Sequence, residues 1–253
     1  MMKLKFLHIP AAIAVFILLG AGTASAQTAG GASTSPAAKK ATKKPTKTTR
    51  KPAPKTKTKT PASPRKTTTT PSRTAQPAVS RDAVYYFDHA MYGCGANDLD
   101  CKIENFTKAI NLSPRLPAPY FNRAVVYYQK KFYNSAVADY TKVIELDEQN
   151  AFAAYNNRAW TFCQMGLFDK ALDDAERALE LKPDYPEALD TRGTAYMGKG
   201  EYRLALDDFN KAIRLAPSNP ELYRSRAALY RKTGKAALAQ ADERKLVELG
   251  GKF

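Results

Sequence analysis

Few residues of this 253-residue chain have side chains whose chemistry goes beyond packing, and the cysteines are the clearest of them. Cys94 and Cys101 flank the turn-forming stretch GANDLD, so we expect a disulfide between them in an oxidising compartment. Closing so short a loop stabilises a fold by roughly 2–3 kcal/mol. Two free thiols in a turn are the alternative. Cys163 is expected to be a small, half-buried residue.

Catalytic and metal-binding sets of residues are missing from the sequence. His89 is the only histidine after the N-terminal leader described below, which leaves too few ligands for a metal site and no second candidate for a general base. There is no phosphate-binding glycine loop and no nucleophile elbow. Paired carboxylates such as Asp173 and Asp174 point about 100° apart on a helix, so they do not converge on one substrate. We therefore expect no enzymatic activity, no metal and no cofactor.

A charged pair recurs along the chain. An arginine occurs four times at offsets of 35, 34 and 34 residues, and an aspartate follows each one 16 residues later. In the copy before them both change together, to His89 and Asn105. This joint change indicates an ion pair, worth about 0.2–1 kcal/mol if partly exposed. A ladder of arginines for an anionic ligand is the alternative. The expected pairs are Arg123 with Asp139, Arg158 with Asp174, Arg192 with Asp208, and Arg226 with Asp242.

The same period predicts the elements that position these residues. A fixed period near 34 residues is typical of stacked helical hairpins, none of which can bury its apolar face alone. Apolar residues follow helical spacing within each copy, and Ala151 is a one-residue loop insertion that explains the single offset of 35. The prediction is an all-α solenoid of about five helix-turn-helix repeats, at residues 83–116, 117–150, 152–185, 186–219 and 220–253.

The copy at 186–219 has small and aromatic residues at characteristic positions. Positions 4, 8, 11, 20, 24, 27 and 32 hold Leu189, Gly193, Tyr196, Ala205, Phe209, Ala212 and Pro217. These residues resemble the tetratricopeptide repeat family, and the resemblance covers about 170 of the 253 residues. It implies a right-handed superhelix with a concave groove that binds peptides or protein surfaces. The first copy departs from the pattern, with Gly93 at position 11 and Lys102 at position 20.

The resemblance also implies which residues line the groove: positions 2, 5, 6, 9, 12 and 13 of each first helix. Trp160 is the only tryptophan, a residue type enriched where binding energy concentrates. Asn122 and Asn157 repeat at position 6, where a carboxamide can bond both the amide and the carbonyl of a peptide. Alternatively, Trp160 packs between hairpins and the asparagines face water. The predicted groove residues are Phe121, Asn122, Val125, Asn156, Asn157, Trp160, Gln164, Asp190, Thr191 and Thr194.

The N-terminus has the layout of a secretory signal. Residues 1–26 combine a basic start, a short apolar run and the small residues Ala24, Ser25 and Ala26. We expect cleavage after Ala26 and a periplasmic or secreted protein. A retained N-terminal anchor is the alternative.

Charge is concentrated in the segment that follows the leader. Residues 27–80 contain thirteen Lys and Arg, no acidic residue and no aromatic residue, so this basic linker is expected to be disordered. From residue 81 onward, 25 basic residues nearly balance 24 acidic ones. The linker is then either a spacer or a contact for an anionic polymer, of the cell envelope or alternatively nucleic acid.

Together these patterns predict a non-catalytic scaffold, exported to the cell envelope, that binds a protein or peptide in the groove and takes no small-molecule substrate. The alternative is an anionic-polymer binder that acts through the basic linker, with the repeats as an assembly platform.

Overall fold

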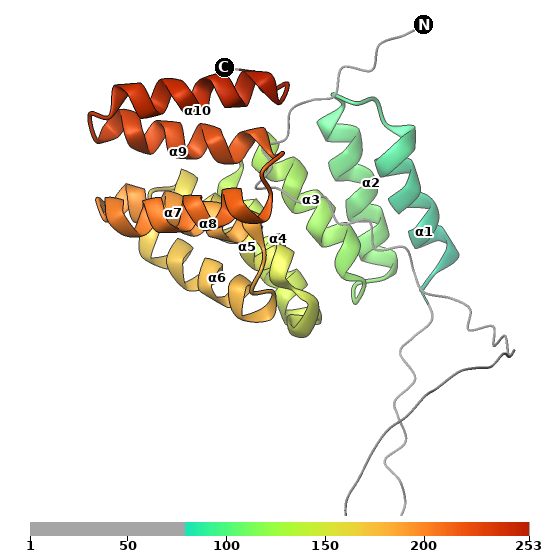
Figure 1. The fold of residues 1–253 in the computed structure, drawn as a ribbon. Helices are drawn as coiled ribbons and strands as arrows, with labels where there is room; N and C mark the ends of the chain where they lie inside the picture. The colour runs from blue at the N-terminus through green and yellow to red at the C-terminus, as the bar shows by residue number, and fades with distance from the viewer. Residues whose placement is uncertain (1–78, 253) are drawn as a thin grey trace, which may run out of the picture. The chain divides into compact units, whose positions relative to one another are not determined.

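The computed structural model describes residues 79–252. This range contains ten α-helices and no strand, which confirms the predicted all-α fold (Figure 1). The predicted leader at 1–26 and all but the last two residues of the predicted linker at 27–80 lie outside the described residues.

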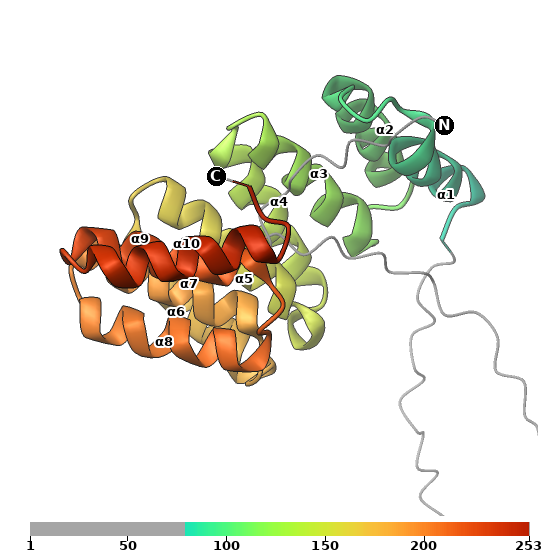
Figure 2. The same ribbon diagram turned by 45° about the horizontal axis from the view of Figure 1, so that its top comes forward.

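The helices pair in chain order into five hairpins, which can be followed by colour from α1 to α10 (Figures 1 and 2). Two short irregular turns accompany them, a π-helical turn η1 (His89–Gly93) after α1 and a 3-10 turn η2 (Glu148–Asn150) before α5. The hairpins are α1 (Arg81–Asp88) with α2 (Leu99–Leu112), α3 (Pro117–Gln129) with α4 (Tyr133–Leu146), α5 (Phe152–Gln164) with α6 (Phe168–Leu181), α7 (Pro186–Lys199) with α8 (Tyr202–Leu215), and α9 (Pro220–Lys232) with α10 (Ala236–Glu248).

Proline and glycine set the limits of several helices. Pro117, Pro186 and Pro220 are each the first residue of a helix, where the missing N–H costs no hydrogen bond. Gly200 ends α7 in the left-handed conformation at φ 84°, which a residue without Cβ adopts at little cost. The equivalent turn between α3 and α4 has Lys131 at φ 62° in place of glycine. The backbone conformation of Lys131 is therefore unfavourable for a residue that has a Cβ.

Small residues let the two helices of a hairpin approach each other. Ala124 and Ala136, at positions 8 and 20 of their copy, are both completely buried. At Gly193 a Cβ would lie only 2.8 Å from Cε1 of Phe209, so this hairpin requires glycine. The pattern of small residues in the sequence thus sets how closely the helices pack.

Each second helix also packs against the first helix of the next hairpin, so contacts run continuously along the stack. Among the first helices, α5 also touches α7 directly, and α7 touches α9. The apolar core is accordingly a series of clusters, one around Tyr140 and Phe121 and another around Leu189 and Leu222. This is the helical repeat packing that the period predicts.

Between residues 79 and 252, no helix combines the length and the hydropathy that crossing a bilayer requires.

Candidate functional site

An aromatic cluster joins two hairpins on the face where the groove is predicted. The indole Nε1–H of Trp160 on α5 donates a hydrogen bond of 2.6 Å to the hydroxyl of Tyr128 on α3. The ring of Tyr128 lies 5.6 Å from that of Tyr133, centroid to centroid, at the start of α4. All three side chains are partly exposed, and burial raises the pKa of Tyr128. Trp160 therefore packs between hairpins and also reaches solvent. From the sequence alone, these two environments, packing between hairpins and exposure in the groove, are alternatives.

Two further predicted groove residues are accessible. Gln164 lies one helical turn beyond Trp160 on α5 and is exposed. Thr194 is partly exposed on α7, at the position in its repeat that Trp160 occupies in the preceding one. We call these five residues, Tyr128, Tyr133, Trp160, Gln164 and Thr194, the Trp160 strip. Tyr128 was not selected from the sequence, although it stands at position 12, one of the predicted groove positions.

The other seven predicted groove residues are buried, and the predicted lining needs correction on this point. They are Phe121, Asn122, Val125, Asn156, Asn157, Asp190 and Thr191, each at most 5% exposed. The physical reason is the close approach of neighbouring helices. Thr191 on α7, for example, donates a 2.8 Å hydrogen bond from its hydroxyl to Oδ1 of Asn156 on α5.

The asparagines at position 6 are satisfied within the domain. Asn122 donates from Nδ2 to the carbonyl of Ala118, one turn earlier on α3, at 2.9 Å. Asn157 is 1% exposed and lies beside Asn156, whose Nδ2 donates to its Oδ1 at 3.3 Å. Neither carboxamide faces water, contrary to the alternative considered for them. Asn122 and Asn157 therefore act as buried, hydrogen-bonded side chains between packed helices.

Phe121 instead borders an apolar cavity of about 170 Å³ between α3, α4 and the start of α5. Its wall includes Pro117, Val143 and Phe152. An apolar cavity of about 150 Å³ holds a benzene-sized group. The cavity is thus large enough for one apolar side chain of a partner.

All four expected arginine–aspartate pairs are present. In each, the guanidinium makes two hydrogen bonds to the carboxylate, as from Arg158 Nε and Nη2 to Asp174 at 2.7 Å each. Across the four pairs the arginine side chains are 15–26% exposed and the aspartates 7–9%. Bidentate, charge-assisted bonds of this kind fix geometry as well as adding energy. The remaining pairs are Arg123 with Asp139, Arg192 with Asp208, and Arg226 with Asp242.

The arginines also connect successive hairpins. Nη1 of Arg158 donates to Oγ1 of Thr141 on the preceding second helix at 2.8 Å, and Nη1 of Arg123 does the same to Thr107 at 2.9 Å. Arg226 reaches Oδ1 of Asn210 in the same way, at 2.7 Å. Three of the four guanidinium groups therefore have all their nitrogens engaged within the domain. This arrangement favours the structural interpretation over an arginine ladder for an anionic ligand.

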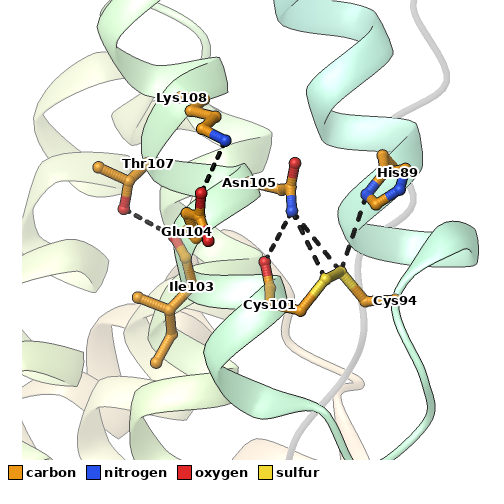
Figure 3. A network of polar contacts seen from close by, with 8 residues as sticks. All are labelled: His89, Cys94, Cys101, Ile103, Glu104, Asn105, Thr107 and Lys108. Carbon is orange, nitrogen blue, oxygen red and sulfur yellow. Dashed lines mark hydrogen bonds and ion pairs between the residues drawn. A yellow bond between two sulfur atoms is a disulfide. The ribbon is translucent and has the colours of Figure 1, made fainter.

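The first hairpin replaces the ion pair with a sulfur site, shown in Figure 3. Cys94 and Cys101 are joined through their sulfurs, with their Cα atoms 5.9 Å apart. Nδ1 of His89 lies 3.9 Å from Sγ of Cys94, and Nδ2 of Asn105 lies 3.7 and 3.6 Å from the two sulfurs. The ligand atoms of His89, Cys94 and Cys101 all lie within 4.8 Å of one another. A metal site was not expected from the sequence for want of ligands, and here three potential ligands come together.

A buried carboxylate lies farther along the stack. Asp190 on α7 is 4% exposed, and its Oδ1 has no hydrogen-bond partner among the described residues. Burial raises the pKa of Asp190 to about 7, Ser225 on α9 opposes this rise, and Glu221 and Glu187 add to it. The Cys163 thiol nearby is also buried, and burial raises its pKa to about 12. Asp190 is a group whose charge the fold disfavours.

Three family models match the chain, and all describe the same repeat. Models described as "Tetratricopeptide repeat" match residues 118–150 and residues 152–185. A third, described as "TPR repeat", matches residues 193–234. These matches confirm the family resemblance inferred from the spacing of small and aromatic residues.

Similar proteins cover only part of this chain. The DnaJ homolog subfamily C member 7 homolog of Schizosaccharomyces pombe is 40% identical over 73 residues, which are 28% of this chain and 15% of the relative. Serine/threonine-protein phosphatase 5 of Rattus norvegicus is 33% identical over 93 residues, 37% of this chain and 18% of that protein. The chain thus spans less than a fifth of the length of these curated relatives.

Solved structures share the fold. The 41-end portion of MamA from Desulfovibrio magneticus RS-1 superposes with a TM-score of 0.58 at 18% identity, covering 68% of this chain and 97% of that one. A thermophilic TPR protein of Thermus thermophilus gives a TM-score of 0.59 at 18% identity, covering 66% and 91%. At this level of identity the likeness concerns the fold.

Proposed function

Because the chain belongs to the tetratricopeptide repeat family, we propose that its repeat domain is a non-catalytic scaffold that binds a protein or peptide on the Trp160 strip. The observation that carries this proposal is Trp160 itself. Its side chain is held by a hydrogen bond to Tyr128 and remains partly exposed beside Gln164. A rigid, partly buried aromatic surface loses little entropy on binding, which is why such residues dominate binding energies.

The apolar cavity beside Phe121 supports the same proposal. It lies between the same two hairpins that Trp160 and Tyr128 connect, α3–α4 and α5–α6. A partner peptide would place an aromatic or apolar side chain against Trp160 and insert a second one into the cavity. Two anchors of this kind give specificity for spacing as well as for side-chain type.

The experiment uses the fact that Trp160 is the only tryptophan of the chain. Its fluorescence therefore reports on the strip alone. The full-length protein is screened against an array of 15-residue peptides, and the peptides that bind are titrated while the emission is followed. We expect binding peptides to shift the emission of the unaltered protein. Trp160→Ala has no tryptophan, so its affinity is measured by the fluorescence anisotropy of labelled peptides, and we expect it to be about thirtyfold weaker, the loss of a binding hot spot.

Two variants separate binding from stability. Trp160→Phe keeps much of the packing, and Tyr128→Phe removes only the hydroxyl that accepts the indole N–H. Leu215→Ala, on an exposed site of α8 that is 40% accessible, is the matched control and should bind peptides normally. Peptides that bind Trp160→Ala as tightly as the unaltered protein would refute the assignment of the strip.

Export to the cell envelope forms the second part of the proposal. The signal-like residues 1–26 support it, and so does the placement of Cys94 and Cys101 at bonding distance, because disulfides persist in oxidising compartments. We expect a mature N-terminus at Gln27 and a periplasmic or secreted protein. Mass spectrometry of the intact protein from fractionated cells tests both, and a cytosolic protein that retains residue 1 would contradict them.

The basic linker favours a second candidate function, binding of an anionic envelope polymer. Its thirteen Lys and Arg without an acidic residue support electrostatic binding that weakens as salt is added. Deleting residues 27–80 distinguishes the two candidates. If the scaffold proposal is correct, the deletion variant binds peptides as tightly as the full-length protein. If the polymer proposal is correct, the deletion variant is absent from the envelope fraction, and the full-length protein leaves that fraction at high salt.

A further inference from the structure

We propose that the first hairpin binds one monovalent copper ion when its cysteines are reduced, through Sγ of Cys94, Sγ of Cys101 and Nδ1 of His89. The proposal stands independently of peptide binding on the Trp160 strip. It starts from the one repeat in which the regular pattern of side chains is replaced.

The replaced positions are those that surround the sulfurs. Where the other four repeats have an arginine, an aromatic residue and an aspartate at positions 7, 11 and 23, the first has His89, Gly93 and Asn105. Cysteines stand beside them, Cys94 at position 12 and Cys101 at position 19. Three coordinated departures at otherwise regular positions remove an ion pair, and together with the two cysteines they bring imidazole, thiol and carboxamide groups into one repeat.

The backbone brings His89 to the sulfurs. The N–H of Cys94 donates to the carbonyl of His89 at 2.9 Å, a bond that spans five residues and widens the helix at its end. Such π-turns recur at functional sites. Gly93 makes room for the imidazole, because a Cβ there would lie 2.7 Å from Cδ2 of His89. His89 thus faces Cys94 from the opposite side of the turn (Figure 3).

The surroundings favour sulfur that carries negative charge. Asn105 points its Nδ2 at both sulfurs, at 3.7 and 3.6 Å, and is held in place by a 2.9 Å bond to the carbonyl of Cys101. Cys101 lies in the first turn of α2, where the helix dipole favours an anion, while the carboxylates of Asp98, which accepts the N–H of Cys101 at 3.0 Å, and Asp100 oppose a further negative charge. Side chains that orient and hydrogen-bond ligands in this way tune the affinity of metal sites.

The ligand set selects the ion. Two thiolates and one imidazole are soft donors, which favour Cu⁺ and Zn²⁺ over hard cations. A structural zinc site almost always has four protein ligands, whereas this cluster offers three, so a Zn²⁺ ion here would need water as its fourth ligand. Three donors are a complete trigonal set for Cu⁺. The Cα separation of 5.9 Å lets the sulfurs part by side-chain rotation after reduction.

Disulfide and ion exclude each other because both use the same sulfur electron pairs. A dithiol reductant supplies two electrons and two protons, which convert the Cys94–Cys101 bond into two thiols while the reductant becomes a disulfide. Binding of Cu⁺ then displaces the two thiol protons to solvent, and His89 binds as the neutral imidazole. The site therefore has two states, an oxidised hairpin without the ion and a reduced hairpin that holds it.

The test is an anaerobic competition for Cu⁺ between the full-length protein and the chromophoric chelator bicinchoninate. We expect the reduced protein to withdraw one Cu⁺ per chain and the oxidised protein to withdraw none. His89→Ala should weaken the affinity at least tenfold, and Asn105→Ala by about 10- to 100-fold, the usual cost of losing a supporting group. Cys163→Ala should leave the stoichiometry at one, because Cys163 is buried elsewhere.

A variant that copies the pattern of the other repeats guards against loss of folding. His89→Arg with Asn105→Asp restores the ion pair that the other four hairpins have, and should keep the helical circular dichroism while losing the site. The proposal is overturned if the reduced protein withdraws no Cu⁺ or if the oxidised protein withdraws as much Cu⁺ as the reduced one. It is also overturned if the double variant binds Cu⁺ like the unaltered chain, or if Zn²⁺ displaces Cu⁺ from the reduced, unaltered protein.

Discussion

Replacing the buried carboxylate of Asp190 with a neutral amide should stabilise the domain in a pH-dependent way. Asp190 is 4% exposed, its Oδ1 lacks a hydrogen-bond partner in the described residues, and burial raises its pKa to about 7 from an ordinary 3.8. Because the folded-state pKa lies above the unfolded one, the unfolded chain loses its proton first as the pH rises. Stability therefore falls between about pH 4 and pH 7.

The size of the effect follows from that difference. Each pH unit between the two pKa values is worth about 1.4 kcal/mol, so ionising Asp190 costs the fold about 4 kcal/mol above pH 7. At pH 5 the cost is about 2 kcal/mol, because the folded carboxyl is still protonated and only the ionisation of the unfolded chain, about one pH unit above its pKa, contributes. Asp190→Asn removes the titration, so the gain in the free energy of unfolding should be about 2–3 kcal/mol larger at pH 8 than at pH 5.

Urea unfolding followed by circular dichroism at the two pH values measures this difference. Any change in packing or hydrogen bonding caused by the amide is present at both pH values and cancels. Asp207→Asn, on an exposed site of α8, is the matched control and should show almost no change between them. A gain that is the same at pH 5 and pH 8 would refute the reasoning, because it would mean that Asp190 does not titrate in this range. The groups that face it, Glu187, Glu221 and Cys163, are the same in both proteins.

Three further substitutions test the packing, each by the free energy of unfolding in urea. Lys131→Gly should stabilise by about 1 kcal/mol, because the residue has a left-handed backbone at φ 62°; an unchanged midpoint would contradict this. Asp208→Ala should destabilise by about 2 kcal/mol, since Arg192 loses two charge-assisted hydrogen bonds; a loss below about 0.5 kcal/mol would place the pair among weak surface pairs. Gly193→Ala should destabilise by about 1–3 kcal/mol through its 2.8 Å approach to Phe209, and a stabilised variant would show that the ring can move.

Much of the fold follows from short-range pattern. The helices lie within the expected copies, except that α1 begins at Arg81, two residues before the first copy. They do so because most apolar and small positions repeat at the same offset, and neighbouring residues in sequence supply most of the contacts of a hairpin. The spacing of Arg158 and Asp174 indicated a pair because positions 7 and 23 face each other across one hairpin. Even the joint change to His89 and Asn105 signalled that the first hairpin is different.

The sequence by itself therefore determined the all-α repeat architecture and the pairing within each hairpin, since both depend on contacts inside a 34-residue unit. Only the tertiary structure decided which side chains of the first helices reach solvent. That outcome depends on how closely α5 and α7 approach, which buries Asn156 and Thr191 and leaves Trp160 accessible. It likewise decided that His89 meets the sulfurs, because a single widened helical turn sets the direction of its ring, and no periodic pattern encodes that turn.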